Sequence, residues 1–258
     1  MNTSAWLFPI CRSSCASPLR LFCFPYAGAG AQMYYPWARV LPPIIDGWAL
    51  QPPGRGPRLR ETPLRDIHGI AFDALTAIQP LLDVPVVFFG HSMGALVAFE
   101  VSRLLRKHGR PTPVHLLLSG TGAPDLPALS RPMHQLPDDT FVEKLREYNG
   151  TPRDVLENRE LMALLLPILR ADFEACETYR CDEQSPLDMP LTLFGGEDDV
   201  DTPPHYFDAW RRHTKGPLTM FWFRGDHFFL HTASDRFLST VVQVLNSIAS
   251  STSHERHW

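Results

Sequence analysis

Short apolar runs alternate with stripes of apolar residues at helical spacing along most of the chain. The runs, rich in leucine, β-branched and aromatic side chains, have the composition of buried strands and comprise residues 19–24, 48–50, 86–89, 114–119, 191–194 and 218–223. Residues 67–82 and 237–248 each place apolar side chains on one helical face. Because strands separated by helices pack into parallel sheets, the pattern predicts an α/β fold, with a mostly parallel sheet and helices on both faces.

Residues 120–190 break this alternation, because they contain several helix signals and no strand signal. One helix is expected to begin near Asp138 and to stop at Gly150, and a longer apolar helix is expected to begin near Glu160. The segment follows the strand after the main central helix and precedes the next strand of the sheet. We therefore predict a helical lid insertion, at about residues 121–189, over one edge of the sheet.

The length of 258 residues is typical of one α/β domain, so we expect a single domain over residues 1–258. Lys and Arg total 24 against 28 Asp and Glu, and the net charge of −4 gives no overall field that would attract nucleic acid or an anionic membrane. No apolar stretch is long enough to span a bilayer, and residues 1–18 lack a basic leader and a cleavage site. We expect a soluble, cytoplasmic protein, with a frayed polar tail at residues 247–258.

The cysteine pattern does not indicate a metal site. The five cysteines are an odd number at irregular spacing, with no C-x-x-C pair and no matching histidine pattern, so free thiols are expected. The small-residue loop at residues 24–30 is not a phosphate cradle, because neither G-x-G-x-x-G nor a P-loop lysine is present. The sequence therefore predicts no metal and no bound cofactor.

The pentapeptide Gly90-His91-Ser92-Met93-Gly94 matches the pattern G-x-S-x-G. It lies between the apolar run at 86–89 and a helical pattern that ends at Gly109. A strand that turns sharply into a helix at this motif forms a nucleophile elbow, which exposes the serine hydroxyl. A chance match in a loop is the alternative, but the flanking strand and helix patterns favour the elbow. Ser92 is therefore the predicted nucleophile.

A serine hydroxyl needs a base to remove its proton and a carboxylate to orient that base. The run at 218–223 leads into Gly225-Asp226-His227, and this strand-then-glycine context makes His227 the predicted base. The run at 191–194 leads into an acidic turn, in which Asp199 fits the spacing G-x-x-D-x-x-x-P and Asp198 is the alternative acid. The order Ser, Asp, His along the chain is that of the α/β-hydrolase arrangement.

The oxyanion that develops during acyl transfer needs two backbone N–H donors. Met93 directly follows the nucleophile and is expected to supply one donor from the start of its helix. The other donor is expected from the small-residue loop at residues 24–30, which follows an earlier strand. Within this loop we predict that Ala27 is the second donor.

Together these motifs resemble those of the stand-alone type II thioesterases of nonribosomal-peptide and polyketide assembly lines. The resemblance covers nearly the whole chain and is carried by Cys23-Phe24-Pro25-Tyr26-Ala27-Gly28, by Pro53-Gly54-Arg55-Gly56 with Arg58 and Glu61, by the pentapeptide at Ser92, by Leu169-Arg170-Ala171-Asp172-Phe173 with Tyr179, and by Gly225-Asp226-His227-Phe228-Phe229-Leu230. It implies an α/β-hydrolase fold and a thioester hydrolase of the serine hydrolase type.

The resemblance further implies hydrolysis of stalled or wrongly primed acyl groups from the phosphopantetheine arm of carrier proteins, through an acyl-enzyme. Acyl or peptidyl carrier domains are then the expected partners of a monomer that meets neither nucleic acid nor a membrane. Phe173 is expected in the acyl pocket beneath the lid. The basic residues of one loop form either a carrier-docking cluster or a solvated, internally paired loop; these are Arg55, Arg58, Arg60 and Arg65.

Other activities on the same triad stay open at this point. A carboxylesterase that acts on small oxygen esters uses the same three residues. An acyltransferase or cyclase differs only in that an amine or alcohol intercepts the acyl-enzyme. A catalytically idle interaction protein is disfavoured by the complete triad.

Overall fold

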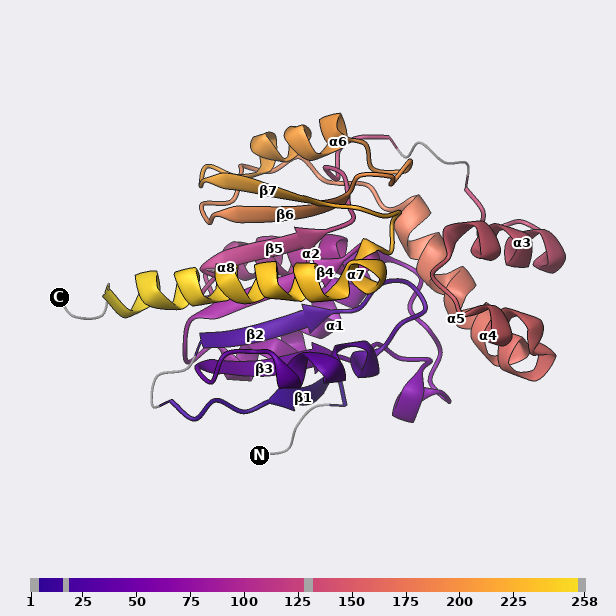
Figure 1. The fold of residues 1–258 in the computed structure, drawn as a ribbon, viewed down its shortest axis with the longest axis horizontal. Helices are drawn as coiled ribbons and strands as arrows, with labels where there is room; N and C mark the ends of the chain where they lie inside the picture. Colours follow the sequence, from indigo (N-terminus) through magenta and orange to yellow (C-terminus); the bar gives the residue numbers. More distant parts are fainter. Residues whose placement is uncertain (1–4, 16–18, 128–131, 255–258) are drawn as a thin grey trace.

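The computed structural model describes residues 5–15, 19–127 and 132–254, and in this part of the chain seven strands form one sheet. Their order across the sheet is β1-β3-β2-β4-β5-β6-β7 (Figure 1). The strands are β1 (Leu7–Cys11), β2 (Leu19–Phe24), β3 (Ile45–Leu50), β4 (Val86–His91), β5 (His115–Ser119), β6 (Leu191–Gly196) and β7 (Leu218–Phe223). Neighbouring strands are parallel except β1 and β3, which confirms the predicted mostly parallel sheet.

The edge strand β1 was not predicted from the apolar pattern. Only Leu7 and Ile10 of its five residues are buried, and Pro9 lies exposed in its middle. An edge strand tolerates proline because one side of its backbone makes no ladder hydrogen bonds. So few buried positions leave almost no apolar run for sequence analysis to detect.

Helices cover both faces of the sheet, as predicted. They are α1 (Ile67–Ile78), α2 (Met93–Lys107), α6 (Pro204–Asp208), α7 (Phe229–Thr232) and α8 (Ser234–His254), with the 3-10 helices η1 (Ala31–Arg39), η2 (Gly56–Arg58), η3 (Gln79–Leu81) and η4 (Ala209–His213). Figure 1 shows α8 in front of the sheet and α1 and α2 behind it. Because side chains alternate along a strand, Phe88 of β4 packs in the core with α1 and α2 while Phe89 packs in the core with η1 and α8.

Three further helices lie between β5 and β6 in the sequence, beyond the carboxyl ends of the parallel strands (Figure 1). They are α3 (Asp138–Tyr148), α4 (Arg153–Glu157) and α5 (Arg159–Thr178), and we call these three helices the lid. The lid has a small apolar core of its own, in which Phe141 and Leu145 of α3 pack with Met162 and Leu169 of α5.

The ends of two helices differ from the predictions. α3 ends at Tyr148 and is capped by Asn149, which adopts the left-handed conformation with φ 57°, so the predicted stop at Gly150 is wrong by one residue. Asparagine tolerates this conformation better than most side chains do. α5 begins at Arg159 rather than Glu160, because the side chain of Asn158 caps the helix by accepting hydrogen bonds from the backbone amides of Glu160 and Leu161.

The predicted polar tail is also wrong for the residues that the structure describes. α8 continues to His254, and Ile248 is only 8% exposed in the core beside the sheet. The hydroxyls of Ser250 and Ser251 each donate to the carbonyl four residues earlier, so these polar side chains remain compatible with a helix. Residues 255–258 lie outside the described part of the chain.

Candidate active site

Ser92 occupies a strained turn between β4 and α2. Its φ of 53° and ψ of −119° put it in a region that side chains rarely adopt, and among the described non-glycine residues only Asn149 also has a positive φ. The backbone N–H of Ser92 donates to the carbonyl of Ser119 at the end of β5, at 2.8 Å. The neighbouring strand therefore holds the turn in place, and backbone strain of this kind concentrates at functional sites.

The two glycines of the pentapeptide allow the backbone to pack this closely. A Cβ atom on Gly94 would lie 2.1 Å from the carbonyl oxygen of Phe24, and one on Gly90 would lie 2.2 Å from that of Gly94. Both obstacles are backbone atoms, which cannot rotate away. The motif thus needs glycine at both positions to bring α2 against β2 and β4.

His227 and Asp199 face one another across the ends of β6 and β7. The imidazole Nδ1 lies 2.8 Å from the carboxylate Oδ2, and the side chain of Asp199 is 1% exposed. Burial opposes ionisation, but hydrogen bonds from His227, from the Thr202 hydroxyl and from the Asp201 amide outweigh it and hold the pKa of Asp199 below its ordinary value. Asp199 is therefore an ionised carboxylate at neutral pH, oriented toward the imidazole.

The other acidic side chains near His227 have different partners. Asp198 accepts a hydrogen bond from the backbone amide of Gly225 at 3.3 Å. Asp226 accepts from the amide of Phe228 at 2.9 Å and from the side chain of Asn149 at 3.1 Å. Between the two acids considered from the sequence, the structure pairs Asp199 with the histidine.

His91, the second residue of the pentapeptide, is a buried neighbour that sequence analysis did not single out. Its Nδ1 lies 2.9 Å from the hydroxyl of Ser119, and its ring centre lies 5.0 Å from that of His227. Burial, together with the nearby His227, lowers the pKa of His91 well below its ordinary value. His91 is therefore neutral and adds no positive charge that would oppose protonation of His227.

One cavity of about 760 Å³ unites the predicted reacting groups. Its wall includes Ser92, His227, Ala27 and Met93, while Asp199 lies behind the histidine. The lid and its ends contribute mostly apolar side chains to this wall: Leu145, Tyr148, Leu169, Phe173, Cys176 and Tyr179. Ser92 and His227 thus share one cavity with Ala27 and Met93, beneath a mostly apolar cover and in a volume typical of sites for small organic ligands.

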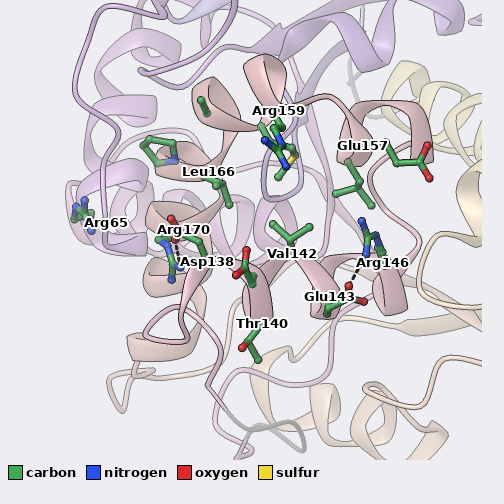
Figure 2. A pocket seen from close by; sticks show the side chains of 15 residues that line it. Arg65, Asp138, Thr140, Val142, Glu143, Arg146, Glu157, Arg159, Leu166 and Arg170 are labelled. Carbon is green, nitrogen blue, oxygen red and sulfur yellow. Dashed lines mark hydrogen bonds and ion pairs between the residues drawn. The ribbon is translucent and has the colours of Figure 1, made fainter.

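A second cavity, of about 1110 Å³, lies among the three lid helices and is shown in Figure 2. Four of its charged side chains are paired with each other: Arg170 contacts Asp138 at 2.5 Å, and Arg146 contacts Glu143. Neither Ser92 nor His227 is among its lining residues. The larger cavity is therefore separate from the catalytic constellation.

The predicted basic cluster does not form a common surface. Arg55 is buried against Asp172, so it is not available to dock a partner. Arg58 pairs with Glu61 at 2.5 Å, and Arg65 pairs with Glu174 at 2.6 Å. The structure corresponds to the internally paired alternative, because burial and local charge partners occupy three of the four arginines.

The described residues contain neither a cluster of metal ligands nor a membrane-spanning helix. All five cysteines are free thiols, and no three His, Cys, Asp or Glu side chains of the described segments come together as a metal site requires. None of the helices between residues 5 and 254 combines the length and apolarity needed to cross a membrane.

Comparison with known proteins gives consistent matches. The family profile of the thioesterase domain matches residues 19–245. Gramicidin S biosynthesis protein GrsT of Aneurinibacillus migulanus is 41% identical over 233 residues, which cover 90% of this chain and 91% of that protein. Thioesterase PikA5 of Streptomyces venezuelae is 37% identical over 216 residues, which cover 83% and 76% of the two chains. The structure of the type II thioesterase BorB from the borrelidin biosynthetic cluster has a TM-score of 0.85, with 35% identity and coverage of 94% and 98%.

Proposed function

The chain belongs to the thioesterase family, and from this premise we propose that it hydrolyses acyl groups carried on the phosphopantetheine arm of carrier proteins. The observation that carries the proposal is the pairing of His227 with Asp199 at 2.8 Å beside a cavity that also contains Ser92. The names of two relatives refer to the biosynthesis of gramicidin S and of borrelidin, and two are named thioesterases, which supports a biosynthetic thioester as the substrate. The α/β-hydrolase fold and serine-hydrolase chemistry are common to this family.

In the first half of the proposed reaction, Ser92 attacks the thioester carbonyl and His227 accepts the hydroxyl proton. Ionised Asp199 stabilises the imidazolium that forms and keeps its Nδ1 in the orienting hydrogen bond. The amides of Ala27 and Met93 donate to the oxyanion of the tetrahedral intermediate. His227 then returns the proton to the departing sulfur, so the phosphopantetheine thiol leaves and the acyl group stays on Ser92.

In the second half, water takes the place of the thiol. His227 removes a proton from water as it attacks the acyl-enzyme, and the same two amides again hold the oxyanion. Collapse of this intermediate returns the proton to Ser92 and releases a carboxylic acid. The protein supplies nucleophile, base and oxyanion donors from its own residues, so the proposed reaction requires no cofactor or metal.

The proposed substrates are stalled or wrongly primed acyl groups on carrier domains of a nonribosomal-peptide or polyketide synthase. The apolar wall beneath the lid, with Leu169 and Phe173 facing the cavity, suits an acyl chain better than a charged one. A cytoplasmic monomer that meets successive carrier domains fits this role.

Loaded carrier proteins test the proposal against the esterase and acyltransferase alternatives. An acetyl-phosphopantetheinyl carrier protein and an acetyl oxygen ester of a comparable alcohol are each incubated with the enzyme, and the products are identified by mass spectrometry. We expect free acetate to be released faster from the carrier protein than from the oxygen ester. Cleavage of the oxygen ester with the carrier left acylated would establish the esterase instead. Transfer of the acyl group to an added amine or alcohol, in preference to water, would establish the acyltransferase.

A further inference from the structure

Two of the segments that carry the family resemblance, residues 53–56 and 169–173, meet in a buried ion pair. Arg55 and Asp172 are 117 positions apart in the sequence, and their side chains are 5% and 0% exposed. Nη1 and Nη2 of the guanidinium donate to the two carboxylate oxygens at 2.6 and 2.7 Å. This parallel, two-bond arrangement fixes the orientation of both groups.

The same pair holds the backbone of the loop that follows β2. The amide of Gly28 donates to Oδ2 of Asp172 at 2.7 Å, and Nη1 of Arg55 donates to the carbonyl of Ala29 at 3.0 Å. Both contacts lie within two residues of Ala27, the proposed oxyanion donor. The loop is therefore anchored by side chains from two distant segments, immediately after the donor.

The geometry of the turn determines where the donor points. The carbonyl of Tyr26 accepts a hydrogen bond from the amide of Ala29 at 3.0 Å. The N–H of Ala27 belongs to the same peptide group as that carbonyl, and in a trans peptide the two point in opposite directions. The N–H of Ala27 thus points out of the turn, and Ala27 lines the cavity that contains Ser92.

The pair also connects this loop to the lid. Asp172 lies on α5 between Leu169 and Phe173, which both line the cavity. Gly28 approaches α5 so closely that a Cβ atom on it would lie 2.5 Å from a methyl carbon of Leu169. The wall beneath the lid and the loop with the oxyanion donor are therefore held in one fixed relation.

We infer that Arg55 and Asp172 form a positioning pair, which holds the amide of Ala27 where the transition-state oxyanion develops. The pair also keeps α5 in a fixed position relative to the loop that contains Ala27. The inference rests on the proposed function, since it needs an oxyanion at this place. Neither side chain touches the reacting atoms, so the pair acts through Gly28 and Ala29. Its loss weakens binding of the tetrahedral intermediate more than binding of the substrate.

The test uses Asp172→Asn and Arg55→Lys, each of which removes the paired two-bond contact. A third variant, Arg55→Met with Asp172→Leu, replaces both charges and leaves no unpaired charge in the interior if the single variants fold poorly. Glu174→Gln is the matched control, because it removes the exposed ion pair with Arg65 from the same helix. Circular dichroism and thermal unfolding establish the folded fraction of each variant.

Two ligands distinguish binding of a tetrahedral adduct at the oxyanion site from binding of the substrate. An alkyl boronic acid forms a tetrahedral adduct with the serine, and an acyl-pantetheine amide occupies the site without reacting. We expect kcat with an acyl-pantetheine thioester to fall about 10- to 100-fold, with KM and the amide's Kd changed less than about threefold. The boronate Kd rises by the same factor as kcat falls, and Glu174→Gln matches the wild type.

Equal weakening of boronate and amide, or a fall in kcat that only follows the folded fraction, would show that the pair is merely structural. Unchanged kinetics in well-folded variants would overturn the inference as well. A wild-type enzyme that neither cleaves the thioester nor binds the boronate would instead refute the proposed function, so the two failures are distinguishable.

Discussion

The imidazole of His227 is held 2.8 Å from the carboxylate of Asp199, although Asp198 directly precedes that aspartate and Asp201 follows it two positions later. We expect Asp199→Asn to lower kcat by about a thousandfold or more. An amide in place of the carboxylate favours the wrong imidazole tautomer and cannot stabilise the imidazolium. The rate of thioester hydrolysis by each purified variant, measured at saturating substrate, provides the test.

Asp198→Asn is the control for this substitution, because Asp198 accepts from the amide of Gly225 rather than facing the imidazole. Its kcat is expected to remain within about threefold of the wild type. The assignment of the acid is wrong if the two variants exchange these outcomes.

The close approach at Gly94 leads to a prediction about stability. Gly94→Ala places a methyl group 2.1 Å from the carbonyl oxygen of Phe24, and we expect it to lower the free energy of unfolding by at least about 3 kcal/mol. Gly109→Ala is a useful comparison, because Gly109 has φ +60° but no atom within 4 Å of the added methyl. That variant carries backbone strain alone, roughly 1–2 kcal/mol. Urea unfolding curves measure both, and equal losses contradict the role assigned to Gly94.

His115 makes the free energy of unfolding depend on pH, because its pKa differs between the folded and the unfolded chain. Burial lowers the pKa of His115 to about 4, while the unfolded chain has the ordinary value of about 6.5. As pH falls below 6.5 the unfolded state binds a proton that the folded state does not, so the wild type loses stability down to about pH 4. Between pH 7.5 and pH 5 the free energy of unfolding should fall in both proteins. The fall in the wild type should exceed that in His115→Gln by roughly 2 kcal/mol. Glutamine does not titrate and can still bond Thr192, which His115 contacts at 2.8 Å. Parallel pH profiles for the two proteins contradict the prediction.

Phe173 forms part of the apolar wall below the lid. Its ring lies 5.6 Å from that of Phe141 and 5.9 Å from that of Tyr148, and it lines the cavity. Phe173→Ala enlarges the space for the acyl chain, so the ratio of kcat/KM for octanoyl over acetyl thioesters should rise roughly tenfold. Leu164→Ala, on the same helix but 53% exposed, should leave the ratio unchanged. An unaltered ratio in the Phe173 variant removes this side chain from the acyl pocket.

Local patterns predicted the elements and residues that depend on short segments. Strands β2 and β7 have the predicted bounds because five of the six residues in each strand are apolar, and the elbow at Ser92 is encoded within five residues. Asp199 was preferred to Asp198 from the spacing of its own turn, although the pairing with His227 depends on where two strands end. Each of these inferences uses a signal that lies within one strand–turn unit, and the roles of Ser92 and Asp199 stay predictions.

Contacts between distant segments could not be predicted in the same way. Nothing in residues 53–56 or 169–173 shows that Arg55 meets Asp172, because the sequence of the basic loop fits a docking cluster as well as an internally paired loop. β1 was missed because its neighbour in the sheet, rather than its own apolar content, makes it a strand. His91 is local in sequence, but its neutrality follows from burial between β5 and the loop of His227.

The most direct measurement compares the wild type with Ser92→Ala on an acetyl-phosphopantetheinyl carrier protein, following both released acetate and the freed thiol. The wild type should release the two in equal amounts, and rapid quenching with mass spectrometry should find the acetyl group on Ser92. The variant should lose at least about a thousandfold in rate while remaining folded. Hydrolysis of the loaded carrier by Ser92→Ala at the wild-type rate would contradict the account.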